Sequence, residues 1–281
     1  MTTNLRAWEG DGEPVALAVN DTPVSRALHA SGRLPGELWL ETSGPLTEEA
    51  VEHFVGRRML LHNGVWDWSL AHDDALSHLD ALTVTRRRLR ATAAPWLSVH
   101  VGFAAATVAY EEGMQATSPV LERDVLLERM VRTVRALQEA LDVPVLLENL
   151  DDQPSPAYRF VCEPSFIDEL VSRTGAFLLL DLAHAQVSAA RQGVAVEAYL
   201  EALPLDRVRQ VHVSGPRRGE GGVLLDAHET LRDVDLALVQ SVLERGTPWA
   251  VTLEYGRTAD ALLRDVAALR ETLGISASRW T

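Results

Sequence analysis

The sequence contains one cysteine, Cys162, in 281 residues, and it has no long apolar run. A single cysteine excludes an internal disulfide framework and any metal site built from several thiolates. No stretch is long and apolar enough for a membrane span, and the first residues lack the basic-then-apolar order of a signal peptide. We therefore expect a cytoplasmic protein with no membrane partner, in which any metal ion is held by nitrogen and oxygen atoms.

Positive charge is also scarce. The chain has 26 Lys and Arg residues against 40 Asp and Glu, a formal net charge of -14. This balance argues against a nucleic-acid partner, because nonspecific binding to nucleic acid needs a dense basic surface. With 47% apolar residues, the chain has material for one large domain over residues 1–281, and a (β/α)₈ barrel of typical size would use nearly all of it.

Short apolar runs rich in Val, Leu and Ile recur through the chain and alternate with stretches of helical periodicity, such as residues 125–141. This alternation predicts an α/β fold, a single (β/α)₈ TIM barrel with a parallel sheet. We predict eight strands, at Val15–Val19, Leu38–Glu41, Met59–His62, Leu97–Gly102 and Val145–Asn149, and in the runs that begin at Phe177, Val208 and Trp249.

Residues of metal-ligand type recur at the carboxyl ends of these strands, where barrel enzymes have their active sites. They occur on six successive predicted strands, from the third to the eighth, and in the loop after the seventh. Their oxygen and nitrogen donors suit iron, zinc or manganese. The nine candidates are His62, His100, Glu148, Asp181, His184, His212, Asp226, His228 and Glu254.

Each candidate alone has an ordinary structural explanation. A strand-end histidine such as His62 is often only hydrogen-bonded, Glu148 could pair with an arginine, and Asp181 or Asp226 could cap a helix. Nine such groups at one barrel mouth, however, would leave many polar atoms unsatisfied without a metal. They also exceed what one ion needs, so we predict two or three ions and a bridging carboxylate.

Within this set we assign the catalytic role to His212, Asp226 and Glu254. Trp66 and Trp68 follow the third strand and are candidates for a wall of the site. Cys162 has no His or Asp partner nearby in the sequence, so we do not expect it to act as a nucleophile.

The segments LLHNG, LSVHVG, VLLENL, LLLDLAHAQVSA, VRQVHVSGP, LLDAHE and VTLEYG resemble the multinuclear non-heme iron-dependent oxidative enzymes, a branch of the xylose-isomerase-like TIM barrels. The resemblance covers nearly the full chain and is most specific from Leu178 to Gly256. It implies the same nine residues as metal ligands, although many members have asparagine at the position of His184.

The resemblance also implies an activity. Members hold two or three iron ions in mixed Fe(II)/Fe(III) states, use dioxygen as co-substrate and modify a ribosomally synthesised precursor peptide, often at cysteine. They usually act with a leader-binding partner protein. On this basis we expect an iron- and dioxygen-dependent oxidoreductase that acts on a peptide in peptide natural product biosynthesis.

Two other enzyme classes remain open. The ligand order also resembles the endonuclease IV class of abasic-site endonucleases, which use three zinc ions as phosphodiesterases, and divalent-metal sugar isomerases share the barrel. A DNA enzyme should carry basic and groove-inserting residues on its strand-end loops, where this chain offers mainly Arg217 and Arg218. A scaffold that only docks a partner would not need nine inward donors.

Overall fold

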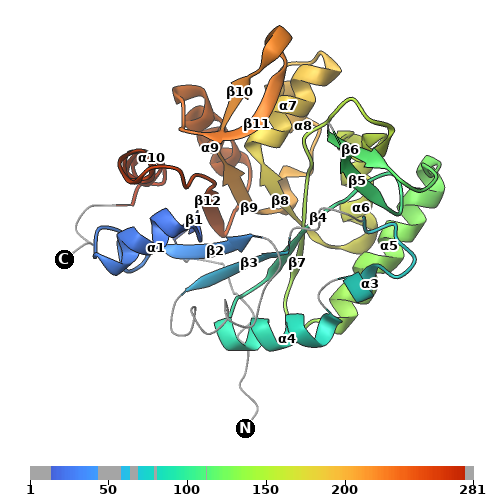
Figure 1. Cartoon of the computed structure of the whole chain (residues 1–281), viewed down its shortest axis with the longest axis horizontal. Coiled ribbons are helices and arrows are strands. Elements are labelled where there is room, and N and C mark those ends of the chain that lie inside the picture. Colours follow the sequence, from blue (N-terminus) through green and yellow to red (C-terminus); the bar gives the residue numbers. More distant parts are fainter. Residues whose placement is uncertain (1–13, 44–57, 64–68, 79–80, 112, 276–281) are drawn as a thin grey trace.

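The computed structural model describes residues 14–43, 58–63, 69–78, 81–111 and 113–275. Its centre is a closed barrel of eight parallel strands in the order β1-β12-β9-β8-β7-β4-β3-β2, which confirms the predicted (β/α)₈ barrel (Figure 1). The barrel strands are β1 (Ala16–Asn20), β2 (Trp39–Ser43), β3 (Met59–Asn63), β4 (Leu97–His100), β7 (Val145–Glu148), β8 (Phe177–Asp181), β9 (Val208–Val213) and β12 (Ala250–Leu253).

The helices lie around the outside of the barrel (Figure 1). They are α1 (Pro23–Ala30), α3 (Ala75–His78), α4 (Ala81–Thr92), α5 (Arg123–Ala140), α6 (Pro164–Thr174), α7 (Leu182–Gln192), α8 (Val196–Glu201), α9 (Asp233–Arg245) and α10 (Ala259–Thr272), with short 3₁₀ turns η1 (Pro156–Tyr158), η2 (Leu205–Arg207) and η3 (Glu220–Gly222). The extent of the domain, residues 1–281, stays a prediction.

The strands are buried because side chains cover both of their faces. All four residues of β7 and all four of β12 are buried, which explains their nearly continuous apolar sequences. The strand register then places polar ends side by side: His100 pairs with Glu148, and Asp181 pairs with His212. The parallel barrel therefore gathers the strand-end donors at one rim.

Aromatic residues close the opposite end of the barrel. Trp96, Phe177 and Trp249 each lie at or just before the start of a strand, and the Trp96 and Trp249 ring centroids are 5.2 Å apart. Trp96 is fully buried, and Trp39 stacks on it with centroids 6.4 Å apart. The barrel interior is therefore filled at its amino-terminal end, and the polar groups face the other end.

Two β-hairpins stand on the carboxyl-end rim, where the sequence had indicated only loops. They are β5 (Val108–Glu111) with β6 (Gly113–Ala116), and β10 (Gly215–Arg218) with β11 (Leu224–Glu229). Their residues are mostly half-buried or exposed, so they lack the apolar runs by which the barrel strands were predicted. Asp226 and His228 thus lie in strand β11 and not in a loop.

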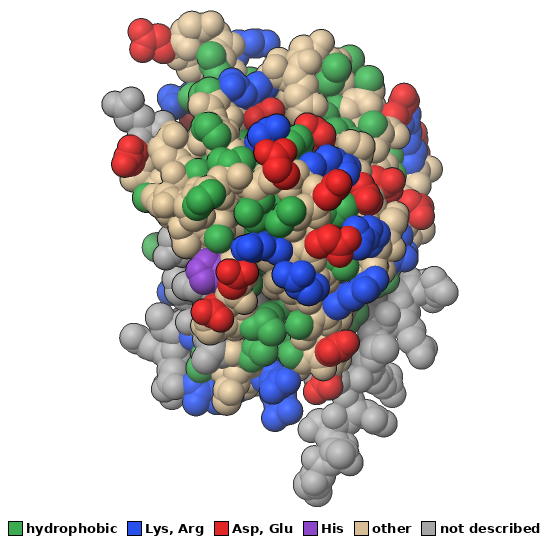
Figure 2. Space-filling model, turned by 90° about the vertical axis from the view of Figure 1, so that its right-hand side faces the viewer, with side chains coloured by type: hydrophobic (Ala, Val, Ile, Leu, Met, Phe, Trp, Pro, Cys, Tyr) green, Lys and Arg blue, Asp and Glu red, His purple; other side chains and the backbone are tan. Residues whose placement is uncertain are grey.

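The outer surface of α5 and α6 mixes both signs of charge. Figure 2 shows the face at the right of Figure 1, where arginine side chains alternate with acidic ones. Arg123 pairs with Glu169 at 2.8 Å, and Arg173 pairs with Glu128 at 2.7 Å. This face therefore offers no continuous basic field. Within the described part of the chain, no helix combines the length and the hydropathy that crossing a bilayer requires.

Candidate metal centre

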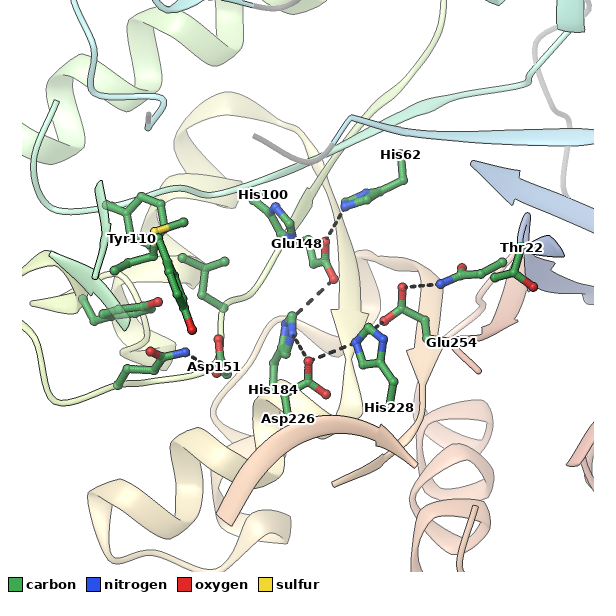
Figure 3. A pocket seen from close by; sticks show the side chains of 16 residues that line it. Thr22, His62, His100, Tyr110, Glu148, Asp151, His184, Asp226, His228 and Glu254 are labelled. Carbon is green, nitrogen blue, oxygen red and sulfur yellow. Dashed lines mark hydrogen bonds and ion pairs between the residues drawn. The ribbon is translucent and has the colours of Figure 1, made fainter. Parts of the chain in front are cut away.

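The structure brings the predicted ligands together at the carboxyl-end rim of the barrel (Figure 3). In each of two groups of three residues, the donor atoms lie within 4.8 Å of one another. The first is His62, His100 and Glu148, and the second is Glu148, Asp181 and His212. Glu148 belongs to both groups, so it is the candidate for the bridging carboxylate, which stays a prediction.

The first group, His62, His100 and Glu148, is held by three barrel strands. The Nε2 atoms of His62 and His100 lie 3.1 and 3.0 Å from Glu148 Oε2. His62 Nδ1 lies 2.9 Å from Ser98 Oγ, which fixes the ring with Nε2 toward the carboxylate. Burial lowers the pKa of His62 to about 4, so its imidazole is neutral at pH 7 and ready to bind a metal.

The second group depends on the junction between β8 and α7. The His184 backbone N–H donates to Asp181 Oδ1 over 2.7 Å, so Asp181 does cap α7, as the alternative interpretation held. This cap uses only Oδ1, one of the two carboxylate oxygens of Asp181. Burial, together with the charges of Glu254 and Asp226, raises the pKa of Asp181 to about 8.

The second group also passes a test of whether a metal fits. Asp181 Oδ2 and His212 Nδ1 are buried and make no hydrogen bond to any residue that the structure describes. His212 Nδ1 lies 3.3 Å from Glu148 Oε1 and 3.4 Å from Glu254 Oε1. Unsatisfied buried groups of this kind are costly, and a cation among them would satisfy both. The donor set therefore fits a metal ion.

The remaining ligands lie nearer the solvent, around hairpin strand β11. His228 Nε2 lies 3.0 Å from Asp226 Oδ2 and 3.6 Å from Glu254 Oε2, and His184 Nε2 lies 3.5 Å from Asp226 Oδ2. His184 Nδ1 is 2.8 Å from the Asn149 carbonyl oxygen, which leaves Nε2 toward Asp226. These residues form neither of the two clustered groups, so a third ion at this place stays a prediction. Asp226 caps no helix, so that alternative is wrong for it.

Glu41 is the functional residue that the sequence analysis missed. It is fully buried, and its Oε2 lies 3.0 Å from His212 Nε2. Gln210 Nε2 donates to both Glu41 oxygens over 2.9 Å, and Trp96 Nε1 donates to Gln210 Oε1 over 2.7 Å. With Nε2 occupied in this way, the His212 ring presents Nδ1 to the metal group. The signal was present, because Glu41 ends an apolar strand as Glu148 does.

Beside the ligands opens a cavity of about 460 Å³. One wall consists of metal-ligand residues, and the other is mainly apolar and aromatic, with Phe103, Tyr110, Met114, Leu150 and Tyr158. Trp66 and Trp68, the candidates for this wall, lie outside the described residues. Cys162 is buried, burial raises its pKa well above the ordinary value, and it does not line the cavity.

Solved structures share the barrel at low sequence identity. A structure titled IOLI protein with a binding zinc atom aligns with a TM-score of 0.64 and 12% identity, covering 95% of this chain and 99% of that one. Endonuclease IV from Thermus thermophilus aligns with a TM-score of 0.57 and 17% identity, covering 94% and 100%. At such identities the likeness shows the fold alone, which is the xylose-isomerase-like barrel.

Two relatives carry the name UPF0276 protein. The one from Bordetella parapertussis is 36% identical over 172 residues, covering 53% of this chain and 58% of the relative. The one from Caulobacter vibrioides is 31% identical over 163 residues, covering 58% of this chain and 56% of the relative. The chain thus spans little more than half the length of these relatives.

A family model covers far more of the chain. The model described as RiPP precursor modification enzyme MbnB/TglH/ChrH matches residues 36–273, a range that includes all nine predicted ligands and Glu41. RiPPs are ribosomally synthesised and post-translationally modified peptides. With this match over most of its length, the chain belongs to the MbnB/TglH/ChrH family of RiPP precursor modification enzymes.

Proposed function

We propose that this protein is a multinuclear non-heme iron-dependent oxidase that uses dioxygen to modify a ribosomally synthesised precursor peptide at cysteine. The observation that carries the proposal is the position of Glu148, which is shared by two groups of donor atoms. A shared carboxylate favours neighbouring ions over one isolated ion. Membership in a family of precursor-peptide modification enzymes supports the substrate class.

In this proposal the nine predicted residues are the ligands, and His212, Asp226 and Glu254 are the catalytic set. His62 offers a neutral nitrogen, and Glu148 an ionised carboxylate. Burial alone would raise the pKa of Glu148, but the imidazoles of His100, His62 and His212 hold it well below the ordinary value. When bound, iron would supply the redox chemistry that a reaction with dioxygen requires.

The protein's own contribution is to shape the surroundings of the ions. Asn20 Nδ2 donates to Glu254 Oε1 over 3.2 Å, and Glu41 holds His212, so both side chains are fixed before a metal binds. The apolar wall with Phe103 and Leu150 keeps water away from the ligands, while the cavity leaves room for a substrate side chain. We also propose a leader-binding partner protein and a cytoplasmic location.

Elemental analysis and Mössbauer spectroscopy on protein produced in iron-supplemented medium test this proposal. We expect two or three irons per chain with both ferrous and ferric character. The His212→Ala variant should lose iron and activity while keeping most of the fold, as judged by circular dichroism. Unchanged turnover in that variant would refute the assignment of the site.

The same measurement separates the oxidase from its main rival. Zinc in every site, together with failure to load iron under anaerobic conditions, would refute the oxidase and favour a phosphodiesterase of the endonuclease IV type. Salt-dependent binding to DNA would then be the next observation to make. A sugar isomerase would convert small aldoses or ketoses under strictly anaerobic conditions.

A further inference from the structure

The wall of the cavity that faces the metal ligands contains one carboxylate with no assigned role, Asp151. It follows β7 three residues after Glu148 and lines the cavity with Gln153. Asp151 belongs to neither group of clustered donor atoms. Cations bound by the ligand set would offset the charges of Glu148 and Asp226, but the carboxylate of Asp151 would keep its own charge.

Among the described residues, Asp151 has no arginine partner. Burial raises the pKa of Asp151, and the charge of His184 opposes this shift, but His184 is itself a proposed ligand and would be neutral with an ion bound. Asp151 Oδ2 accepts a hydrogen bond from Gln153 Nε2 over 2.8 Å. The chain contains no lysine, and no arginine of the described residues forms an ion pair with Asp151. Its neighbour Asp152 differs, because Arg191 Nε lies 3.5 Å from Asp152 Oδ1. A partly buried carboxylate without a cation is a costly feature, which points to a cationic ligand.

The surface next to Asp151 suits a long side chain. Tyr110 and Met114 face each other across the β5–β6 hairpin, and both line the cavity. Tyr110 is 79% exposed, so its ring lies open at the cavity mouth, and Figure 3 shows it extending toward Asp151. Behind them Phe103 and Tyr158 pack edge to face, with ring centroids 5.3 Å apart.

This combination fits one chemical class of side chain. Arginine and lysine have an apolar stem that packs on surfaces such as Met114, and a cation that binds carboxylates and aromatic faces. A neutral apolar side chain would leave Asp151 without a partner, and an acidic one would be repelled. The net charge of -14 further favours the approach of a basic peptide segment.

We propose that Asp151, Tyr110 and Met114 form a binding site for a basic side chain of the substrate, adjacent to the residue that is modified. The proposal rests on the proposed function for the identity of the ligand as a peptide. It assigns to this chain a preference for Arg or Lys next to the target cysteine.

Two matched peptides test the site: acetyl-Arg-Cys-Arg amide and the same peptide with citrulline at both Arg positions. Citrulline keeps the shape of arginine and lacks its charge. Isothermal titration of the iron-loaded protein without dioxygen should show at least about tenfold tighter binding of the arginine peptide, since a hydrogen bond to a charged group contributes about 1.5–3 kcal/mol.

Substitutions in the protein show which residue causes the preference for the arginine peptide. Asp151→Asn should weaken the binding of the arginine peptide alone, so that both peptides bind with similar affinity. Asp152→Asn removes the same charge one residue away and should keep the preference. Tyr110→Leu, at an exposed position, should weaken the arginine peptide by about two- to fivefold through loss of the cation–π contact. This variant keeps the test open if Asp151→Asn fails to fold.

The outcomes separate this site from the proposed function. Equal binding of both peptides, no binding of either, or a preference that persists in Asp151→Asn would overturn the site. Oxidation of the peptides is then followed separately after dioxygen is admitted. A charge preference lost in Asp151→Asn without any oxidation would support the site and count against the oxidase. Oxidation of both peptides at equal rates would support the oxidase and count against the site.

Discussion

The candidate metal centre has two differently built sides. The inner group, His62, His100 and Glu148, lies on three barrel strands, and its two most buried side chains, His62 and Glu148, are 5% and 2% exposed. The outer group, Asp226 and His228, lies on hairpin strand β11, where the His228 side chain is 44% exposed and its backbone has a left-handed φ of 45°. Barrel strands thus place buried donor groups, whereas the hairpin places donor groups that solvent can reach.

The inner and outer groups also differ in the charge states of their histidines. Burial lowers the pKa of His62, while His228 keeps a proton at pH 7. Burial would lower the pKa of His228 as well, but its hydrogen bond to Asp226 and the charge of Glu254 raise it to about 9. We therefore expect the inner group to retain its ion under conditions in which the outer group exchanges its own.

The largest effect should come from removing the carboxylate that joins the groups. Glu148→Gln keeps the size of the side chain but removes its charge and one acceptor, at a residue 1% exposed. Metal affinity of both clustered groups should fall by more than about 100-fold, because loss of an outer supporting residue alone costs 10- to 100-fold. Elemental analysis after dialysis against a chelator measures this loss.

Glu169→Gln is the matched control for that substitution. Glu169 lies on α6, 2.8 Å from Arg123, with a side chain 41% exposed. It should leave the metal content unchanged. If Glu148→Gln retained two or more ions through the chelator step, the shared position of Glu148 would be irrelevant to metal binding.

Lowering the pH should separate the inner and outer ions. Below about pH 9 an ion must displace a proton from His228, so the affinity of the outer group falls about tenfold per pH unit, or about 100-fold from pH 8 to pH 6. With its pKa near 4, His62 is neutral throughout this range and imposes no such loss on the inner group.

Metal content after dialysis at a series of pH values tests this difference. The outer ion should leave first as the pH falls, and the inner ion last. In His228→Ala the outer ion should be absent already at pH 8. Simultaneous loss of all ions at one pH would show that the two groups do not differ in this way.

The barrel could be predicted from the sequence because each strand has its own signal. Runs such as Val145–Asn149 are apolar on both faces, and a polar residue lies at or near the end of each. The hairpins could not be predicted, because residues such as Tyr110 and Leu225 are exposed and follow no apolar alternation. Their positions depend on packing against the barrel rim.

The gathering of the candidate ligands could be predicted for the same reason, since barrel topology brings strand ends to one rim. What the sequence did not reveal was the support behind the ligands. Glu41 lies in β2 without a histidine nearby in the sequence, and its contact with His212 joins residues 171 positions apart. The role of Asp151 likewise depends on the β5–β6 hairpin, which brings Tyr110 to the same cavity.

Replacing Glu41 should have the next effect in size. Glu41→Gln keeps an acceptor for His212 Nε2 but removes the charge, whereas Glu41→Ala removes both. We expect the ion bound by Glu148, Asp181 and His212 to lose about 10- to 100-fold in affinity in the alanine variant and less in the glutamine variant. Chelator competition on each protein gives these affinities, and equal affinities in all three proteins would contradict a positioning role.

The smallest effect should come from removing an arginine that hydrogen-bonds to the strand of the outer group. Arg257, which follows β12, donates to Glu229 Oε1 over 2.8 Å and to the carbonyl oxygen of Ala227, between Asp226 and His228. Arg257→Ala should weaken the binding of the outer ion by only about two- to fivefold, because an exposed ion pair contributes about 0.2–1 kcal/mol.

Arg218→Ala is the control, since Arg218 donates to Gly222 within the hairpin turn and does not reach the barrel. The difference should appear in the rate at which a chelator removes the first ion, with the last ion unaffected. Equal rates in both variants would mean that β10 and β11 hold Asp226 and His228 in place by their own pairing.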